Sequence, residues 1–218
     1  MRCARTRAVR HSLVVCRATH LRQLLIIHSC PRPLSLALPA GSFIFIYGIL
    51  TSGKENANLK CAAALIVALT VAGSGHDLNP AATAQTFIAA DNDHLTTLAT
   101  IVAQCLGGIL ALQVGCYLGS ATKAKKSAAK DDNLKSSIME FIGTFVFFLG
   151  AKAGGNTAVA TGTALFVAAS MIDYGHFNPA VTIMSVFQNS THPENAACWI
   201  GAQIVAVFAA VKVAAYCH

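Results

Sequence analysis

The sequence predicts an all-α membrane protein in which one helical unit occurs twice. Apolar residues make up 55% of the 218 positions and charged residues 11%, a composition that soluble domains rarely have. The tripeptide Asn-Pro-Ala occurs at residues 79–81 and again at 178–180, each time before a short apolar stretch. The residues around the first copy recur around the second at an almost constant spacing. These observations predict a duplicated bundle of six transmembrane helices plus two re-entrant half-helices.

Six apolar segments have about the length that a bilayer-spanning helix needs, which is roughly 17 to 25 residues. They are residues 34–51, 57–73, 95–119, 137–151, 156–172 and 196–217. Two further apolar stretches, residues 79–90 and 178–189, are too short to cross a bilayer. A membrane protein tolerates such half-length helices where they line a water-filled cavity. We therefore expect both short stretches to line a pore.

The two Asn-Pro-Ala boxes are typical of helix N-termini. The first box consists of Asn79, Pro80 and Ala81, and the second of Asn178, Pro179 and Ala180. Asparagine is a strong N-cap residue, and proline is favoured at the first helical position because its missing N–H would be unpaired there. A helix that begins inside an apolar protein points free N–H groups and a partial positive charge at whatever lies ahead. Each box therefore predicts a polar cavity at the start of its helix.

Matching residues at regular spacing divide the chain into repeats. The matches are Asn79 with Asn178 and Gln104 with Gln203, 99 positions apart, and residues 41–48 with 143–150, 102 positions apart. We expect four regions: a basic tail over 1–33, a first repeat over 34–119, a lysine-rich connecting loop over 120–136 and a second repeat over 137–218. Duplicated membrane units of this kind are a known route to transporters and channels.

From about residue 40 to its end, the chain resembles the aquaporin family, the major intrinsic proteins that form water and small-solute channels. The resemblance rests on the two boxes, on their flanking apolar spans, and on MEFIGT around Glu140, which is similar to the start of a family half. It implies a duplicated aquaporin-like bundle in a lipid bilayer and a homotetramer with one pore per subunit. By the same resemblance, Asn79 and Asn178 would donate N–H groups to water in single file, while the opposed half-helix dipoles repel cations.

The residues around the second box depart from the family pattern. The family usually has an arginine directly after this box, in the constriction that screens solutes, whereas this chain has Val181 and no arginine after Arg32. Valine is smaller and donates no hydrogen bond, so we expect a wider and more apolar selectivity filter. Thr182 and Ile183 follow where the family's glycerol channels tend to carry an aspartate, so the substrate signal is split. Gly175, also assigned to the filter, lies where some members carry a mercury-sensitive cysteine.

Three polar residues near the boxes each have two interpretations. His76 and His176 either line the inner vestibule, where protonation would gate the pore, or hold the loops through hydrogen bonds to their backbone. The second interpretation is the favoured one. Glu140 is either a pore carboxylate that relays protons or a buried acceptor for backbone N–H groups of a box loop. The resemblance favours structural support for Glu140.

No pattern in the sequence is typical of an enzyme, a metal centre or a cofactor site. The chain contains no glycine-rich phosphate loop, nucleophile elbow or paired carboxylate set, and its eight cysteines lack metal-ligand spacing. We therefore expect no catalysis, no metal and no cofactor. We also expect no nucleic-acid partner, because the arginine-rich tail lacks a nucleic-acid-binding fold and interleaved aromatic residues.

The tail over residues 1–33 carries the excess positive charge. All seven arginines lie there, and no acidic residue occurs before Glu55. The tail is interpreted as a targeting segment, a cytoplasmic tail or an aberrant start, because Pro31, Pro33 and Pro39 interrupt the first span. The loop over 120–136 holds five lysines, which by the positive-inside rule compete with the tail for the cytoplasmic side. We expect a multi-pass protein of the plasma membrane or of an organelle or vacuole membrane.

The predicted function is passive transport of water, with glycerol, urea and ammonia as further candidate solutes. Three different functions stay open beside it. The absent arginine allows an ion-leaky channel, Glu140 and the histidines allow a proton-coupled carrier, and the irregular start allows a non-conducting adhesion or assembly homologue.

Overall fold

The computed structural model describes residues 37–73, 77–90, 93–121, 133–172 and 175–217, and all the regular structure within these ranges is helical. The helices are α2 (Ala37–Thr51), α3 (Ala57–Ala72), α4 (Pro80–Ala90), α5 (His94–Tyr117), α6 (Asn133–Ala153), α7 (Ala158–Met171), α8 (Pro179–Phe187) and α9 (Pro193–Tyr216). The all-α prediction is therefore confirmed. The tail over 1–33, His76 and most of the loop over 120–136 lie outside the described residues.

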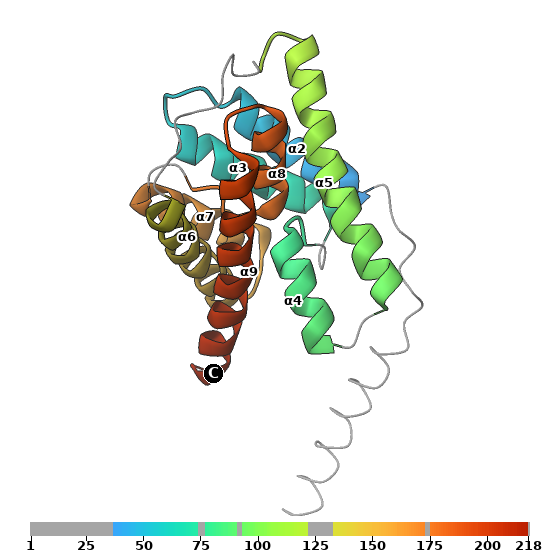
Figure 1. Ribbon diagram of the computed structural model, residues 1–218. Coiled ribbons are helices and arrows are strands. Elements are labelled where there is room, and N and C mark those ends of the chain that lie inside the picture. Colours follow the sequence, from blue (N-terminus) through green and yellow to red (C-terminus); the bar gives the residue numbers. More distant parts are fainter. Residues whose placement is uncertain (1–36, 74–76, 91–92, 122–132, 173–174, 218) are drawn as a thin grey trace, which may run out of the picture. The chain divides into compact units, whose positions relative to one another are not determined.

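The predicted helix starts at the two boxes are confirmed. Helix α4 begins at Pro80 and α8 at Pro179, each directly after its box asparagine. In Figure 1 the two short helices run in opposite directions from the middle of the bundle. Their 11 and 9 residues correspond to only about 17 and 14 Å of helix, roughly half of a bilayer's hydrocarbon core.

The longer helices pack as two similar sets. In the first set α2 packs against α3 and α5, and in the second α6 packs against α7 and α9, while α3 and α7 join the sets. Small residues allow the same close approach in both: a Cβ added at Gly48 would collide with the Cβ of Ala64, and one at Gly150 with that of Ala164. Gly48 and Gly150 are matching positions of the repeat. Small residues are typical of helix contacts inside membranes.

Three of the described helices are long and apolar enough to cross a membrane: α5 and α9 with 24 residues each and α6 with 21. Helices α2, α3 and α7 are apolar but shorter, with 15, 16 and 14 described residues. Pro39, predicted to interrupt the first span, lies in the first turn of α2, where a helix tolerates proline. The six predicted spans thus correspond to six helices, three of them shorter than a full bilayer crossing.

Helix α5 shows how the bundle is inverted relative to a soluble protein. Its exposed side carries Leu98, Leu106 and Leu110, whereas Gln104 and Gly108 face inward. A large apolar outer surface suits lipid contact, and a polar, small-residue inner face suits close packing around a polar centre. The site therefore lies on the inner side of the bundle.

Candidate pore at the two Asn-Pro-Ala boxes

The two box asparagines cap their own half-helices. The side-chain oxygen of Asn79 accepts a hydrogen bond from the Ala81 N–H at 3.0 Å, and that of Asn178 accepts one from the Ala180 N–H at 2.8 Å. Both asparagines are buried, with exposed fractions of 6% and 4%. Each oxygen therefore satisfies a free donor of a helix end that water would otherwise have to satisfy.

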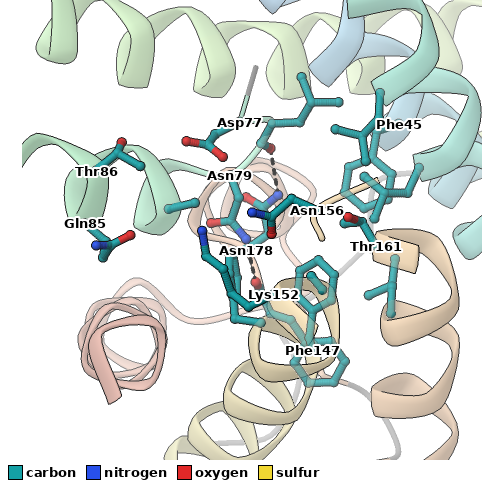
Figure 2. A pocket seen from close by; sticks show the side chains of 18 of the residues that line it. Phe45, Asp77, Asn79, Gln85, Thr86, Phe147, Lys152, Asn156, Thr161 and Asn178 are labelled. Carbon is teal, nitrogen blue, oxygen red and sulfur yellow. Dashed lines mark hydrogen bonds between the residues drawn. The ribbon is translucent and has the colours of Figure 1, made fainter. Parts of the chain in front are cut away.

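The asparagine amides also join the two loops to each other. Asn79 Nδ2 donates to the Phe177 carbonyl at 2.8 Å, and Asn178 Nδ2 donates to the Leu78 carbonyl at 2.9 Å. Figure 2 shows the two side chains next to each other with their hydrogen bonds dashed. Each amide nitrogen carries two N–H groups, and the bond to the opposite loop occupies one of them. The second N–H of each asparagine makes no hydrogen bond to the part of the chain that the structure describes.

A buried carboxylate holds the loop before the second box. Glu140 Oε1 accepts the His176 backbone N–H at 2.6 Å, and Oε2 accepts the Phe177 backbone N–H at 2.9 Å and Gln203 Nε2 at 2.8 Å. Gln203 Nε2 also donates to Thr182 Oγ1 at 3.0 Å. Hydrogen bonds to an ionised acceptor are the stronger kind, so this cluster fixes the loop to α6 and α9.

In the first repeat a glutamine amide holds the loop before the box. Gln104 Nε2 donates to the Asp77 carbonyl and, at 3.0 Å, to Thr83 Oγ1. Gln104 and Thr83 match Gln203 and Thr182 in the second repeat. The residue that matches Glu140 is Leu38, which has no carboxylate to offer. The two loops therefore share the glutamine and threonine but differ in the acidic group.

Phe177 has an unusual backbone conformation directly before the second box. Its φ of 54° lies in the left-handed region, which is rare for a bulky residue and indicates local strain. Its ring lies against two glycines, since a Cβ added at either Gly143 or Gly175 would collide with the ring. The absence of side chains at these positions makes room for the ring. The strained backbone in turn directs the Phe177 carbonyl to Asn79.

A cavity of about 280 Å³ lies beside the boxes, on the side to which α4 runs. Its polar lining is contributed by the loops before both boxes, by both asparagines, by α4 and by the region where α6 ends and α7 begins (Figure 2). The polar lining residues are Asp77, Asn79, Gln85, Thr86, Lys152, Asn156, Thr161, His176 and Asn178. Phenylalanine, leucine and alanine side chains form the remaining wall. This mixture suits small polar molecules rather than a large apolar ligand.

The family model for major intrinsic proteins matches residues 50–155, which run from the end of α2 through the first box to the end of α6. The chain belongs to the major intrinsic protein family. Members of this family, the aquaporins, are membrane channels for water or small solutes, and the apolar helices of this chain agree with a membrane location. No curated protein matches the chain at a significant level. The second box lies beyond the matched residues, and its hydrogen bonds to the first connect it to the same site.

The predicted vestibule and filter residues of this family member lie in different places. His176 lines the cavity, its Nδ1 lies 3.2 Å from Thr182 Oγ1, and its ring meets Trp199 edge-on at 5.3 Å. Val181 is buried in the first turn of α8, and neither Val181 nor Gly175 is among the described residues that line the cavity. The filter assignment of these two residues stays a prediction, as does the vestibule assignment of the histidines.

Three polar residues of the cavity carry no signal in the sequence that would assign them to a pore. Lys152 and Asn156 lie at the edges of the predicted spans, where polar residues are expected at a membrane surface, and Thr161 lies inside an apolar span. Their spacing of four and five residues forms no motif. The one available sign is that Lys152 directly follows a predicted span, while helix α6 extends to Ala153.

Proposed function

We propose that this protein is a passive channel in which water crosses between the two box asparagines, with small neutral solutes such as glycerol, urea and ammonia as further substrates. One observation carries the proposal. Two half-helices start at the boxes. Each box asparagine caps its own half-helix, donates a hydrogen bond to the opposite loop and lines the same polar cavity. Two helix starts that face each other inside an apolar bundle suit a narrow pore that passes neutral molecules and repels cations.

The opposed helix starts explain why such a pore would exclude protons and cations. Each half-helix places partial positive charge at its N-terminus, and α4 and α8 both begin at the centre of the bundle. The second N–H of each asparagine orients a passing water as a hydrogen-bond acceptor. A water whose oxygen accepts hydrogen bonds from both asparagines has no lone pair left for a neighbouring water. It therefore cannot take up a proton from that neighbour and relay it through the boxes.

Val181 supports the wider substrate range. With valine in place of the usual arginine, the filter position loses a fixed charge and several donors, so solutes larger than water meet less resistance there. We expect Val181→Arg to lower glycerol or urea flux more than water flux. An unchanged ratio of glycerol to water permeability in this variant would show that Val181 does not line the filter.

The deciding experiment is stopped-flow light scattering of vesicles that contain the purified full chain. An osmotic gradient of an impermeant solute reports water permeability, and inward gradients of glycerol or urea report solute permeability. Empty vesicles are the control. Water flux above the control supports the channel, and flux no faster than the control contradicts it and favours the non-conducting homologue.

The same vesicles distinguish a channel for neutral solutes from an ion channel and from a carrier. Electrical current across a bilayer with the protein would indicate the ion-leaky channel. Saturable uptake driven by a pH gradient would indicate the proton-coupled carrier, which would use Glu140. The contacts of Glu140 argue against the carrier, because its three hydrogen bonds come from structural groups of the loop and of α9. Chemical cross-linking in the membrane tests the proposed homotetramer.

A further inference from the structure

The cavity beside the boxes contains a lysine whose place the box geometry does not explain. Lys152 lies in the last turn of α6 and lines the cavity together with Asn156 and both box asparagines (Figure 2). Among the residues that the structure describes, its ammonium has neither a hydrogen bond nor an ion pair. No second lysine and no arginine is among the described lining residues. The positive charge is therefore free to act on solutes.

We propose that Lys152 is a charge-selectivity residue of the pore: its ammonium repels cations at the mouth on the α4 side while neutral solutes pass. The inference rests on the proposed channel function. The chain has no arginine directly after the second box. In this proposal the fixed positive charge comes instead from α6, on the opposite side of the boxes. Rings and single residues of fixed charge select permeants in pores by this effect.

The surroundings of Lys152 strengthen the effect of its charge. Phe147, Phe148 and Leu165 form apolar wall in the same cavity. Low-dielectric walls around a narrow cleft focus the field of a charge and extend its reach along the cleft. The box helices add positive potential from the far end of the cavity, because both start there. A cation that enters the cavity would thus be repelled by Lys152 and by both helix starts.

Asp77 is the one carboxylate among the described lining residues, and its removal provides a second test of cation exclusion. It lies on the loop before the first box and makes a contact of its own within the chain. This contact is not an ion pair with Lys152, so the ammonium keeps its charge exposed to the cavity. Removing the negative charge with Asp77→Asn should strengthen cation exclusion, the opposite of removing Lys152.

A purely structural role of Lys152 leads to a different expectation. A lysine in the last turn of a helix interacts favourably with the negative end of the helix dipole. In that case its loss would lower the stability of α6 without changing which solutes pass. The discriminating quantity is therefore a ratio of permeabilities and not the total flux.

The test compares methylammonium, a small cation, with urea, a neutral solute of similar size, in vesicles that contain the full chain. We expect Lys152→Met to raise the methylammonium-to-urea permeability ratio on the order of fivefold. Lys152→Arg should keep the wild-type ratio. Lys212→Met is the matched control, because Lys212 is an exposed lysine near the end of α9 that does not line the cavity.

Each outcome decides one question. If wild-type vesicles pass no water above the control, the channel proposal fails and the role of Lys152 fails with it. If Lys152→Met passes water normally and keeps the wild-type ratio, only the role of Lys152 is overturned. If Lys152→Met does not insert, the wild-type protein still provides the test, since salt of about 1 M shortens the Debye length to about 3 Å and should raise the cation ratio. If the methylammonium-to-urea permeability ratio does not change with salt concentration, the proposal is overturned.

Discussion

The two Asn-Pro-Ala boxes have the same hydrogen-bond pattern, but their loops are held by different groups. Both use a glutamine and a threonine behind the box, but the second adds the buried carboxylate of Glu140, and the first has Leu38 at that position. The second loop is therefore held by charge-assisted hydrogen bonds to its backbone, and the first by neutral ones. The box geometry does not need the carboxylate in both halves, because each asparagine also fastens the opposite loop.

Removal of the carboxylate should change stability most. Glu140→Ala would leave the buried N–H groups of His176 and Phe177 without an acceptor, at a cost of roughly 3 kcal/mol or more. The first repeat has no carboxylate to remove, so the comparison is Gln104→Ala, which removes the amide that holds the first loop and should cost less, about 1 to 2 kcal/mol. Thermal unfolding of the detergent-solubilised variants measures both. Equal losses would mean that the two loops are supported to the same degree.

Substitutions of Asn178 test the feature that both boxes share, an asparagine that caps its helix and donates to the opposite loop. Asn178→Leu removes a helix cap worth roughly 1 kcal/mol together with the donor to Leu78, and we expect it to abolish water flux. Asn178→Asp keeps an oxygen for the Ala180 N–H but loses the donor, so it should fold better than the leucine variant and still conduct poorly. Stopped-flow measurements on both, with Asn79→Leu beside them, provide the comparison. Wild-type flux in a well-inserted Asn178→Leu protein would contradict the pore assignment.

A matched pair of glycines compares the packing of the two loops. A Cβ at Gly143 would collide with the ring of Phe177, whereas one at the matching Gly41 would lie 2.8 Å from the flexible end of Leu78. We expect Gly143→Ala to destabilise the protein by about 1 to 3 kcal/mol and Gly41→Ala by clearly less. Unfolding temperatures of the two variants measure the difference. A larger loss at Gly41 would show that the ring of Phe177 can move aside.

The N-cap residues of α5 and α9 should cause the smallest difference in stability between the repeats. Asp93 caps α5, with its Oδ2 2.8 Å from the Thr96 backbone N, while the matching His192 makes no side-chain cap bond to α9. The backbone and hydroxyl hydrogen bonds from Thr96 lower the pKa of the exposed Asp93 carboxyl below its ordinary value of 3.8. Because this pKa is lower in the folded state, the stabilisation is present above that ordinary value and is lost as the pH falls through the folded pKa.

The cap comparison is measured by unfolding at two pH values. Asp93→Ala should lower the unfolding temperature slightly near neutral pH and have less effect in strong acid, where the wild-type carboxyl is protonated too. His192→Ala should change stability little at either pH. A pH-independent loss in Asp93→Ala would mean that the ionised carboxylate is not what stabilises the start of α5.

Local features of the sequence were enough to predict the class of the protein and the helices that start at its candidate site. Composition predicted a membrane protein, the repeated boxes predicted where α4 and α8 begin, and the apolar segments predicted the six longer helices to within a few residues at most ends. A helix cap and a hydrophobic run act on their own neighbours in the chain, so both can be recognised without a structure. The repeat spacing also identifies Gln104 and Gln203 as matching positions.

The contacts between those elements depend on tertiary packing. The exchange of hydrogen bonds between Asn79 and the loop of Phe177, the left-handed backbone of Phe177 and the placement of Lys152 in the cavity involve residues from separate parts of the chain. A single sequence carries no sign of such partners, because they are brought together by the packing of distant segments. Lys152 follows an apolar span as many surface lysines do, and its place beside the boxes depends on how α6 packs in the bundle.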